Sequence, residues 1–271
     1  IDTPVEHKEL NQDGYSIHYF VSGDKINDLV IFLHPAFGDH RCFDKQIDYF
    51  SKQYRVITID LLGHGLSQVD KSNDKIDISV EHLKTIIEKE GHEKAHFVGG
   101  SMGTLIAQYF ALKYPDKINS LTVLGGYDIN KESKEVAKAQ RFENIKWIVR
   151  ALFSMNAFRR HVAAVTVINP EEQARFYDMA SLFTRKSFWV MSRLNNMIRP
   201  RDNIKRSYPL LIMNGDKDIE LAIGVSRLWH TEESDSTFHL ISNAGHCANM
   251  DNAREFNEIV MDFIAQKKLI T

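Results

Sequence analysis

Short apolar runs alternate with helical patterns along this chain of 271 residues, and this alternation constrains the fold more than any other feature. The apolar runs, rich in β-branched residues, lie at 29–33, 55–59, 95–98, 121–124, 209–213 and 237–241. Continuous runs of this length are typical of central strands covered on both faces. Apolar residues between them recur at helical spacing, as in Val80, Leu83 and Ile87. The pattern predicts an α/β sheet with right-handed crossovers, and alternation over 15–21 predicts an antiparallel edge strand.

One segment interrupts this alternation. Residues 129–207 contain none of the chain's 14 glycines, and their patterns predict consecutive helices at Glu132–Leu152, 158–165, 171–183 and 186–197. The segment carries 16 basic and 7 acidic residues, a balance of +9, so the remainder carries −11 in a chain of net charge −2. We therefore predict a helical cap at 129–207, inserted in an α/β core formed by 1–128 and 208–271.

Composition excludes several classes of protein. The small net charge gives no global basic field for nucleic acid. Two cysteines, Cys42 and Cys247, exclude a disulfide scaffold and a four-cysteine zinc site, and we expect both to be reduced and structural. No apolar run approaches the roughly 18–20 residues that span a bilayer. The start at Ile1 has no signal-peptide pattern and no Met, so we expect that upstream residues were removed and that the protein is cytoplasmic, as a monomer or homodimer.

The strongest chemical signal is Gly99–Gly103, which has the sequence Gly-Gly-Ser-Met-Gly and lies between an apolar run and a helical pattern. Such a turn between strand and helix projects the hydroxyl of Ser101 out of the sheet from a strained backbone. We expect a Cβ atom at 99 or 103 to clash, which explains the glycines. The following helix points its N-terminus at the centre where negative charge develops. The alternative is a glycine-rich turn with a solvated serine.

A serine hydroxyl needs a base to take its proton. Of the 12 histidines, His246 stands out because it lies in a loop after the last strand-like run, whereas His82 is expected at a solvated helix position. Imidazole titrates near neutrality and can accept and return a proton. The carboxylate that orients it is expected at the C-terminal end of a strand, where open α/β sheets place their sites. We favour Asp218, with Asp216 and Asp128 as alternatives.

The loop that follows the run 29–33 has the sequence His-Pro-Ala-Phe-Gly. Acyl transfer passes through a tetrahedral oxyanion, which two backbone N–H groups usually hold. The amide groups of Ala36 and Met102 are the expected donors of this oxyanion hole. The alternative is an ordinary connection between a strand and a helix.

These motifs together resemble the α/β-hydrolase fold family, specifically its lidded serine hydrolases. The resemblance covers nearly the whole chain and rests on five segments in order, which are Leu33–Gly38, Asp60–Ser67, Gly99–Gly103, Gly215–Asp218 and Gly245-His246. It implies Ser101 as nucleophile, Asp218 as acid and His246 as base. It also implies a mostly parallel eight-stranded sheet flanked by helices, with a helical cap inserted after strand six.

Pro35 is a departure, because the family usually has glycine after the histidine. Proline lacks an N–H, but the proposed donor is the next residue, so the hole need not be lost; the identity of the second donor stays open. A serine at 101 argues against haloalkane dehalogenases and epoxide hydrolases, which need a carboxylate nucleophile, and against relatives with cysteine there. Proline aminopeptidases are disfavoured because their Gly-Gly-Pro oxyanion loop is missing.

The predicted cap is rich in aromatic residues, and the substrate pocket of a lidded enzyme usually lies between lid and body. An apolar acyl or aryl pocket is expected to be lined by Phe37, Trp147, Phe153, Phe188 and Trp189. The alternative is that these side chains mostly form the core of the cap. The positive balance of the cap could favour anionic substrates, although scattered arginines are more typical of solvated helix faces.

Ser101, His246 and Asp218 predict a serine hydrolase that cleaves small carboxylic esters through an acyl-enzyme, with no metal or organic cofactor. An alternative is a hydrolase of carbon–carbon bonds in a dienoic or β-diketone acid, with arginines of the cap holding the carboxylate. A third hypothesis is a ligand receptor of the same fold that turns over slowly. Acyl transfer to alcohols or peroxide stays open, because exclusion of water cannot be deduced from sequence.

Overall fold

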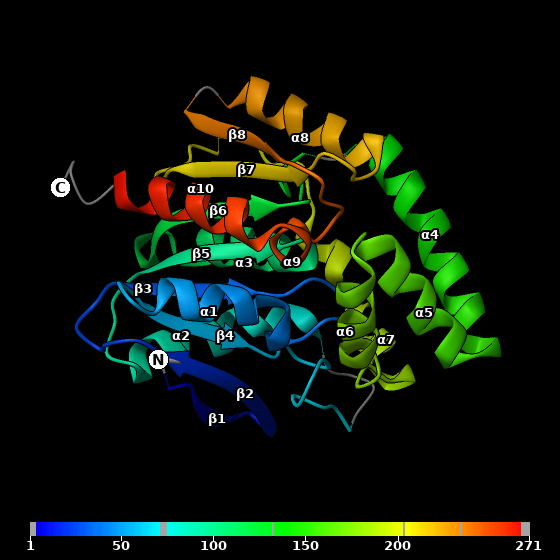
Figure 1. The fold of residues 1–271 in the computed structure, drawn as a ribbon, viewed down its shortest axis with the longest axis horizontal. Coiled ribbons are helices and arrows are strands. Elements are labelled where there is room, and N and C mark those ends of the chain that lie inside the picture. The colour runs from blue at the N-terminus through cyan, green and yellow to red at the C-terminus, as the bar shows by residue number, and fades with distance from the viewer. Residues whose placement is uncertain (1–3, 71–74, 132, 203, 234, 267–271) are drawn as a thin grey trace.

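The computed structural model of the protein describes residues 4–70, 75–131, 133–202, 204–233 and 235–266. One sheet runs through the molecule, with helices on both of its faces and a group of helices at one end (Figure 1). The strands are β1 (Glu6–Gln12), β2 (Tyr15–Ser22), β3 (Leu29–Leu33), β4 (Arg55–Ile59), β5 (Ala95–Gly100), β6 (Ile118–Leu124), β7 (Leu210–Gly215) and β8 (Ser236–Ile241). Their order across the sheet is β1-β2-β4-β3-β5-β6-β7-β8.

The sheet is mostly parallel, as predicted. β1 and β2 form an antiparallel hairpin, β2 pairs antiparallel with β4, and all other neighbours are parallel. The prediction of β2 as an edge strand is wrong, because β1 lies outside it. β1 is a polar stretch in which only Leu10 is fully buried, so it has no apolar run that sequence could reveal.

Helices of the body cover both faces of the sheet. They are η1 (His40–Phe43), α1 (Asp44–Phe50), η2 (Ile76–Ile78), α2 (Ser79–Lys89), α3 (Met102–Lys113), η3 (Pro115–Lys117), α8 (Glu220–Glu232), α9 (Ala248–Asp251) and α10 (Ala253–Ala265). The periodic face of α2 is buried, as its spacing predicts. His82 on α2 is also buried rather than solvated, against the prediction; its ring packs on Tyr15, and burial lowers its pKa to about 4.

A helical segment lies between β6 and β7. It contains α4 (Lys134–Phe153), α5 (Met155–Thr166), α6 (Pro170–Ala180), α7 (Arg185–Met191) and η4 (Leu194–Met197). The predicted first residue of its first helix, Glu132, lies outside the described residues. The last predicted helix is divided into α7 and η4, because the Ser192 hydroxyl donates to the Trp189 carbonyl at 2.6 Å and competes with continued helix.

Two apolar cores lie on opposite faces of the sheet. Alternate residues of β3 belong to different cores, with Ile31 in one and Phe32 in the other, as the two-residue period of a strand requires. The helical segment shares in both cores, since Phe176 packs into the second and Val190 into the first. None of the helices in the described part of the chain has the length and apolarity to cross a membrane.

Candidate active site

The carboxyl ends of four parallel strands place the predicted residues at one edge of the sheet. Ala36 follows β3, Ser101 follows β5, Asp218 follows β7 and His246 lies in the loop after β8. Parallel neighbours end at the same edge, which is where open α/β sheets form their clefts.

Ser101 occupies a strained turn between β5 and α3. Its φ is 47° and its ψ is −111°, a conformation that residues other than glycine rarely adopt. The turn is held by the Ser101 amide, which donates to the Leu124 carbonyl at 2.8 Å, and by the Thr104 hydroxyl, which donates to the Ser101 carbonyl at 2.6 Å. The strained backbone predicted at this serine is therefore present.

Gly99 and Gly103 allow the chain to pass closely around Ser101. A Cβ atom at Gly99 would lie 2.7 Å from the carbonyl carbon of Gly103, and one at Gly103 would overlap the Leu33 carbonyl. Real Cβ atoms do not approach backbone so closely, so the predicted clash at both positions is confirmed. The start of α3 consequently lies directly against the end of β3.

His246 and Asp218 form a hydrogen-bonded pair. The imidazole Nδ1 lies 3.0 Å from Oδ2 and 3.1 Å from Oδ1 of the carboxylate. The carboxylate is itself held by the Asn214 side chain, which donates to Oδ2 at 3.1 Å, and by the Ile219 amide, which donates to Oδ1 at 2.8 Å. These contacts fix Nδ1 as the protonated nitrogen and leave Nε2 as the basic one.

The alternative carboxylates have other partners. Asp216 accepts the Ala244 amide at 3.2 Å, and Asp128 accepts the Asn130 amide at 2.9 Å and faces Arg206 at 3.8 Å. Of the three acids considered from the sequence, the structure places Asp218 against the imidazole.

The charges and hydrogen bonds within the pair favour a protonated His246 beside an ionised Asp218. Burial lowers the pKa of His246, but the charge and hydrogen bond of Asp218 outweigh this effect, so the pKa lies above its usual value. Burial likewise raises the pKa of Asp218, and the opposing effects of His246, Asn214 and the Ile219 amide bring it below its ordinary value. The carboxylate therefore stays ionised while the imidazole titrates.

The His246 ring lies beside the end of β6, the strand whose Leu124 carbonyl accepts the Ser101 amide. Gly125, at a φ of 64°, follows Leu124, and a Cβ atom there would lie 2.8 Å from Cε1 of the imidazole. Only a residue without a side chain leaves room for the ring. Among the described residues the Ser101 hydroxyl has no hydrogen-bond partner, and catalytic contacts of this kind commonly tighten only when substrate binds.

The loop after β3 packs against the Ser101 turn. The Pro35 ring lies 3.5 Å from where a Gly100 Cβ would be, so the two loops are in contact. Met102 is the first residue of α3, and an amide at this position has no acceptor within its helix. The Ala36 and Met102 amides, the predicted oxyanion donors, thus belong to two touching loops.

His34 fixes the loop that carries Ala36. Its Nε2 accepts the Leu61 amide at 3.0 Å, so Nδ1 carries the proton and donates to the Pro35 carbonyl at 2.8 Å. Burial lowers its pKa and keeps the ring neutral. His34 belongs to the motif of the loop after β3, but its role as a link between the loops after β3 and β4 was not predicted.

Aromatic rings surround Phe37 beside this loop. Its ring centroid lies 5.2 Å from Trp147, 5.1 Å from Phe158, 4.9 Å from Phe183 and 6.3 Å from Phe188. We call these five residues the Phe37 cluster. It unites three of the five predicted pocket residues, and it adds Phe158 and Phe183, which helical spacing alone could not place there.

Phe153 and Trp189, the other two predicted pocket residues, are not brought to the Phe37 cluster. Their exposed fractions are 87% and 62%. Phe153 ends α4, whose only fully buried residue is Ala151, and Trp189 lies on α7 beside the buried Val190. Both side chains lie on outer faces of their helices.

Asp251 connects the histidine loop to the helical segment. Its carboxylate accepts the Gly245 amide at 2.8 Å and, from the turn between α5 and α6, the amides of Ile168 at 3.1 Å and Asn169 at 2.9 Å. The Cys247 amide also donates to the Thr166 carbonyl at 2.9 Å. The position of His246 therefore depends directly on the end of α5.

Residues that could hold a metal ion have other partners. Within the described ranges, one group of three potential ligands lies close together: Asp39, His40 and Asp60. Asp39 accepts the Arg41 guanidinium at 2.6 Å, and Asp60 accepts His40 Nδ1 at 2.7 Å and the Leu66 amide at 2.8 Å. These contacts give the group a structural role in the loops after β3 and β4.

The two cysteines are unpaired and buried. Burial raises the pKa of both thiols well above their usual value, which keeps them protonated and unreactive.

Comparisons with known proteins agree with the fold. A family model for the alpha/beta hydrolase fold matches residues 28–147. A 2-hydroxy-6-oxononadienedioate/2-hydroxy-6-oxononatrienedioate hydrolase from Paraburkholderia phymatum is 27% identical, over 92% of this chain and 91% of the relative. Epoxide hydrolase 3 of Xenopus tropicalis is 23% identical, over 96% of this chain and 78% of the relative.

Among solved structures, one from a study of the carboxylesterases of Nitrososphaera gargenis matches this chain with a TM-score of 0.83 and 17% identity. The match covers 97% of this chain and 100% of the solved chain. The eight-stranded sheet, the turn at Ser101 and these similarities all point to the same fold. The chain has the alpha/beta hydrolase fold.

Proposed function

We propose that this α/β hydrolase is a serine hydrolase that cleaves small carboxylic esters, with Ser101 as nucleophile, His246 as base and Asp218 as the orienting acid. The observation that carries the proposal is one sheet edge that holds a serine at a φ of 47° and a histidine–aspartate pair at 3.0 Å. A strained serine and an oriented imidazole at one edge are what activation of a hydroxyl requires.

The proposed reaction has two halves. His246 Nε2 takes the proton of Ser101 as the serine oxygen attacks the ester carbonyl, and the oxyanion accepts hydrogen bonds from the Ala36 and Met102 amides. The alcohol leaves with the proton from His246, and an acyl-enzyme remains on Ser101. Water then gives a proton to His246 and attacks the acyl carbon, and His246 returns that proton to the Ser101 oxygen as the carboxylic acid leaves.

Asn214 is a further positioning residue in this proposal. Its amide donates to Asp218 Oδ2, and that oxygen also accepts His246 Nδ1. The carboxylate is therefore held from two sides, and its ring partner is aimed with Nε2 away from β7. No motif in the sequence indicated this role.

The helical segment is proposed as a cap, at 129–207, over an acyl or aryl pocket. The Phe37 cluster supports this, because rings from α4, α5 and α7 meet the loop of Ala36. Apolar rings beside an oxyanion hole suit the apolar part of a small substrate. The unpaired cysteines are typical of a reducing compartment, and we place the enzyme in the cytoplasm on that ground.

A second candidate function is hydrolysis of a carbon–carbon bond in a dienoic acid. It is favoured by the relatives named as 2-hydroxy-6-oxo dienoate hydrolases, including one from Comamonas testosteroni that is 24% identical over 97% of this chain and 95% of the relative. The same serine, histidine and aspartate would serve it. The named epoxide hydrolases are a weaker guide, because Ser101 stands where that chemistry needs a carboxylate.

A fluorophosphonate probe tests the serine. The expected result is one covalent adduct located on Ser101 by peptide mass spectrometry, with no adduct in the Ser101→Ala variant. Equal labelling of that variant would contradict the proposal.

Two substrate classes then separate the candidates. The kcat/KM values for p-nitrophenyl acyl esters and for a 2-hydroxy-6-oxo dienoate are compared in one preparation. A higher value for esters supports the first candidate, and a higher value for the dienoate replaces it with the second. A single slow turnover with retained product on both would instead indicate a receptor.

A further inference from the structure

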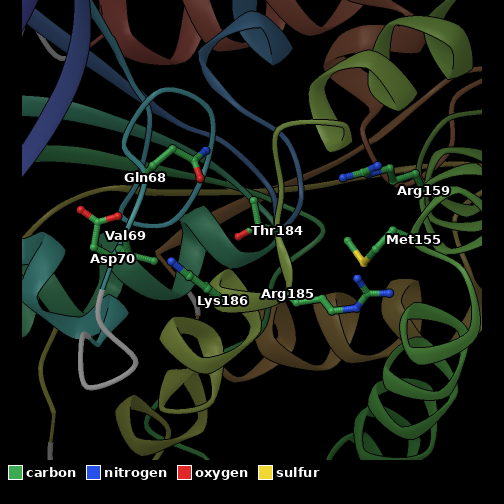
Figure 2. Close-up of a pocket in the computed structure, with 8 residues that line it drawn as sticks. All are labelled: Gln68, Val69, Asp70, Met155, Arg159, Thr184, Arg185 and Lys186. Atoms are coloured by element: carbon green, nitrogen blue, oxygen red, sulfur yellow. The ribbon is translucent and has the colours of Figure 1, made fainter.

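A cavity of about 420 Å³ lies between the loop after β4 and the starts of α5 and α7. Figure 2 shows its lining, which comprises Gln68, Val69, Asp70, Met155, Arg159, Thr184, Arg185 and Lys186. None of these residues belongs to the proposed catalytic set. Thr184 of the cavity lining directly follows Phe183 of the Phe37 cluster in the sequence.

The charge of the lining is unbalanced. Arg159, Arg185 and Lys186 bring three cations, and Asp70 brings one carboxylate. Within the described ranges, none of these cations forms an ion pair with a carboxylate. Arg206, by contrast, is paired with Glu233 at 2.8 Å. An excess of unpaired cations around a hollow favours an anionic ligand.

Arg159 is fixed in place by groups that do not neutralise it. Its Nε donates to the Ala180 carbonyl at 3.0 Å, and its Nη2 donates to the carbonyls of Ser181 at 3.0 Å and Phe183 at 3.1 Å. Carbonyl oxygens orient a guanidinium but carry no net charge. The positive charge at this wall is therefore preorganised.

Arg185 and Lys186 keep most of their donors free. One N–H of Arg185 donates to the Ala151 carbonyl at 3.0 Å, which leaves the rest of its five for a ligand. The side-chain amine of Lys186 has no hydrogen bond to any described residue, so all three of its N–H donors are available. A planar fork of free N–H groups matches the two oxygens of a carboxylate.

The cavity also offers apolar contact. Figure 2 shows Met155 between the side chains of Arg159 and Arg185, and Val69 on the opposite wall. The methionine side chain adapts to ligands of different shape. The lining therefore suits an anion that carries a hydrocarbon group better than a small inorganic anion.

We propose that this cavity binds small organic carboxylates, with Arg185 holding the carboxylate, the fixed Arg159 adding positive charge on the same side and Met155 contacting the apolar part (Figure 2). The site is separate from Ser101, and its occupancy does not depend on the proposed reaction. Hexanoate has the chemistry that the lining selects.

The test is binding of hexanoate to the full chain by isothermal titration calorimetry, with hexanol and inorganic phosphate as comparison ligands. Hexanoate is expected to bind more tightly than either. Arg185→Gln should weaken its binding about fivefold or more, because it removes a charge-assisted contact. Lys186→Gln should weaken it less, because the Lys186 side chain points away from Arg185 (Figure 2). Thermal melting of both variants checks that they remain folded.

Lys52→Gln is the matched control, since it removes the same charge from an exposed loop after α1. It should leave hexanoate binding unchanged. Equal affinity for hexanoate and hexanol, or equal affinity in the wild type and both cavity variants, would overturn the proposal. Weakening by Lys52→Gln to the same extent would also overturn it, because the effect would then come from net charge.

Discussion

The sheet edge around Ser101 and the helix α4 differ in how much room their side chains have. At the sheet edge, even the first carbon of a side chain at Gly99 or Gly103 would meet backbone. On α4 only Ala151 is fully buried, and Leu152 is 69% exposed. The first region leaves no room for a side chain at these glycines, whereas much of the second faces solvent.

Helix α6 shows that this difference does not follow the boundary between body and helical segment. Glu172 of α6 pairs with Lys45 at 2.7 Å, Arg175 pairs with Asp44 at 3.0 Å, and Phe176 is fully buried. α6 is therefore attached to the body as firmly as body helices are. Contact with the body, rather than position in the sequence, decides which residues are constrained.

The largest effect is expected from Ser101→Ala. Loss of the nucleophile should reduce kcat about 10⁴-fold or more while the melting temperature changes little, because the hydroxyl has no partner among the described residues. Ser192→Ala, in the helical segment, should leave kcat within about twofold. Steady-state kinetics and thermal melting measure both. Activity within tenfold of wild type in the Ser101 variant would remove this serine from the reaction.

Two phenylalanines of the helical segment test whether buried and exposed residues of this segment differ in how much they stabilise the protein. Phe158→Ala should lower the free energy of unfolding by about 3–5 kcal/mol, because the ring is fully buried in the Phe37 cluster. Phe153→Ala should change it by about 0.5 kcal/mol or less, because the ring is 87% exposed. Denaturant unfolding gives both values. A large loss at Phe153 would mean that α4 is covered in solution.

Two glycines test the close approach at the sheet edge. Gly103→Ala should destabilise the protein by about 1–3 kcal/mol, because the new Cβ would overlap the Leu33 carbonyl. Gly224→Ala, on α8, adds a Cβ with no atom within 4 Å and should stabilise the protein by up to about 1 kcal/mol through helix propensity. Chemical denaturation compares the two, and equal effects would refute the account of the Ser101 turn.

The smallest expected effect is in the pH profile. His246 acts as a base only when neutral, and its pKa is raised, so kcat/KM should begin to fall at a pH above the usual value of about 6.5. Below that point it should fall about tenfold per pH unit. Asp218→Asn should move this acid limb to lower pH. A wild-type profile that stays flat to pH 5 would argue against His246 as the base.

Much of the fold could be predicted because the central strands are buried on both faces. β3 and β4 coincide with their apolar runs, and all five residues of each are buried. Burial on both faces leaves a signal in composition alone. β1 leaves none, since it is an edge strand whose pairing with β2 depends on backbone hydrogen bonds.

The candidate site was only partly predictable. Ser101, Asp218 and His246 each follow an apolar run, so their common edge follows from strand order. Gly125 could not be found in this way, because its importance comes from the loop after β8, which brings His246 against it. Asn214 was missed although it lies only four residues before Asp218, because spacing does not show that its side chain turns back to the carboxylate. The exposed faces of α4 and α7 were equally hidden, because spacing gives the period of a helix and not its partner.

The carboxylate of Asp251 limits how such molecules can be recombined. It receives amides from the histidine loop and from the turn at Ile168 and Asn169, so a helical segment grafted from another protein would arrive without its matching acceptor. Residue 251 and the turn at 166–169 therefore form a unit that a chimaera must exchange together. Leu152 and Phe153, at the end of α4, are mostly exposed, and insertions or length changes during evolution should accumulate there first.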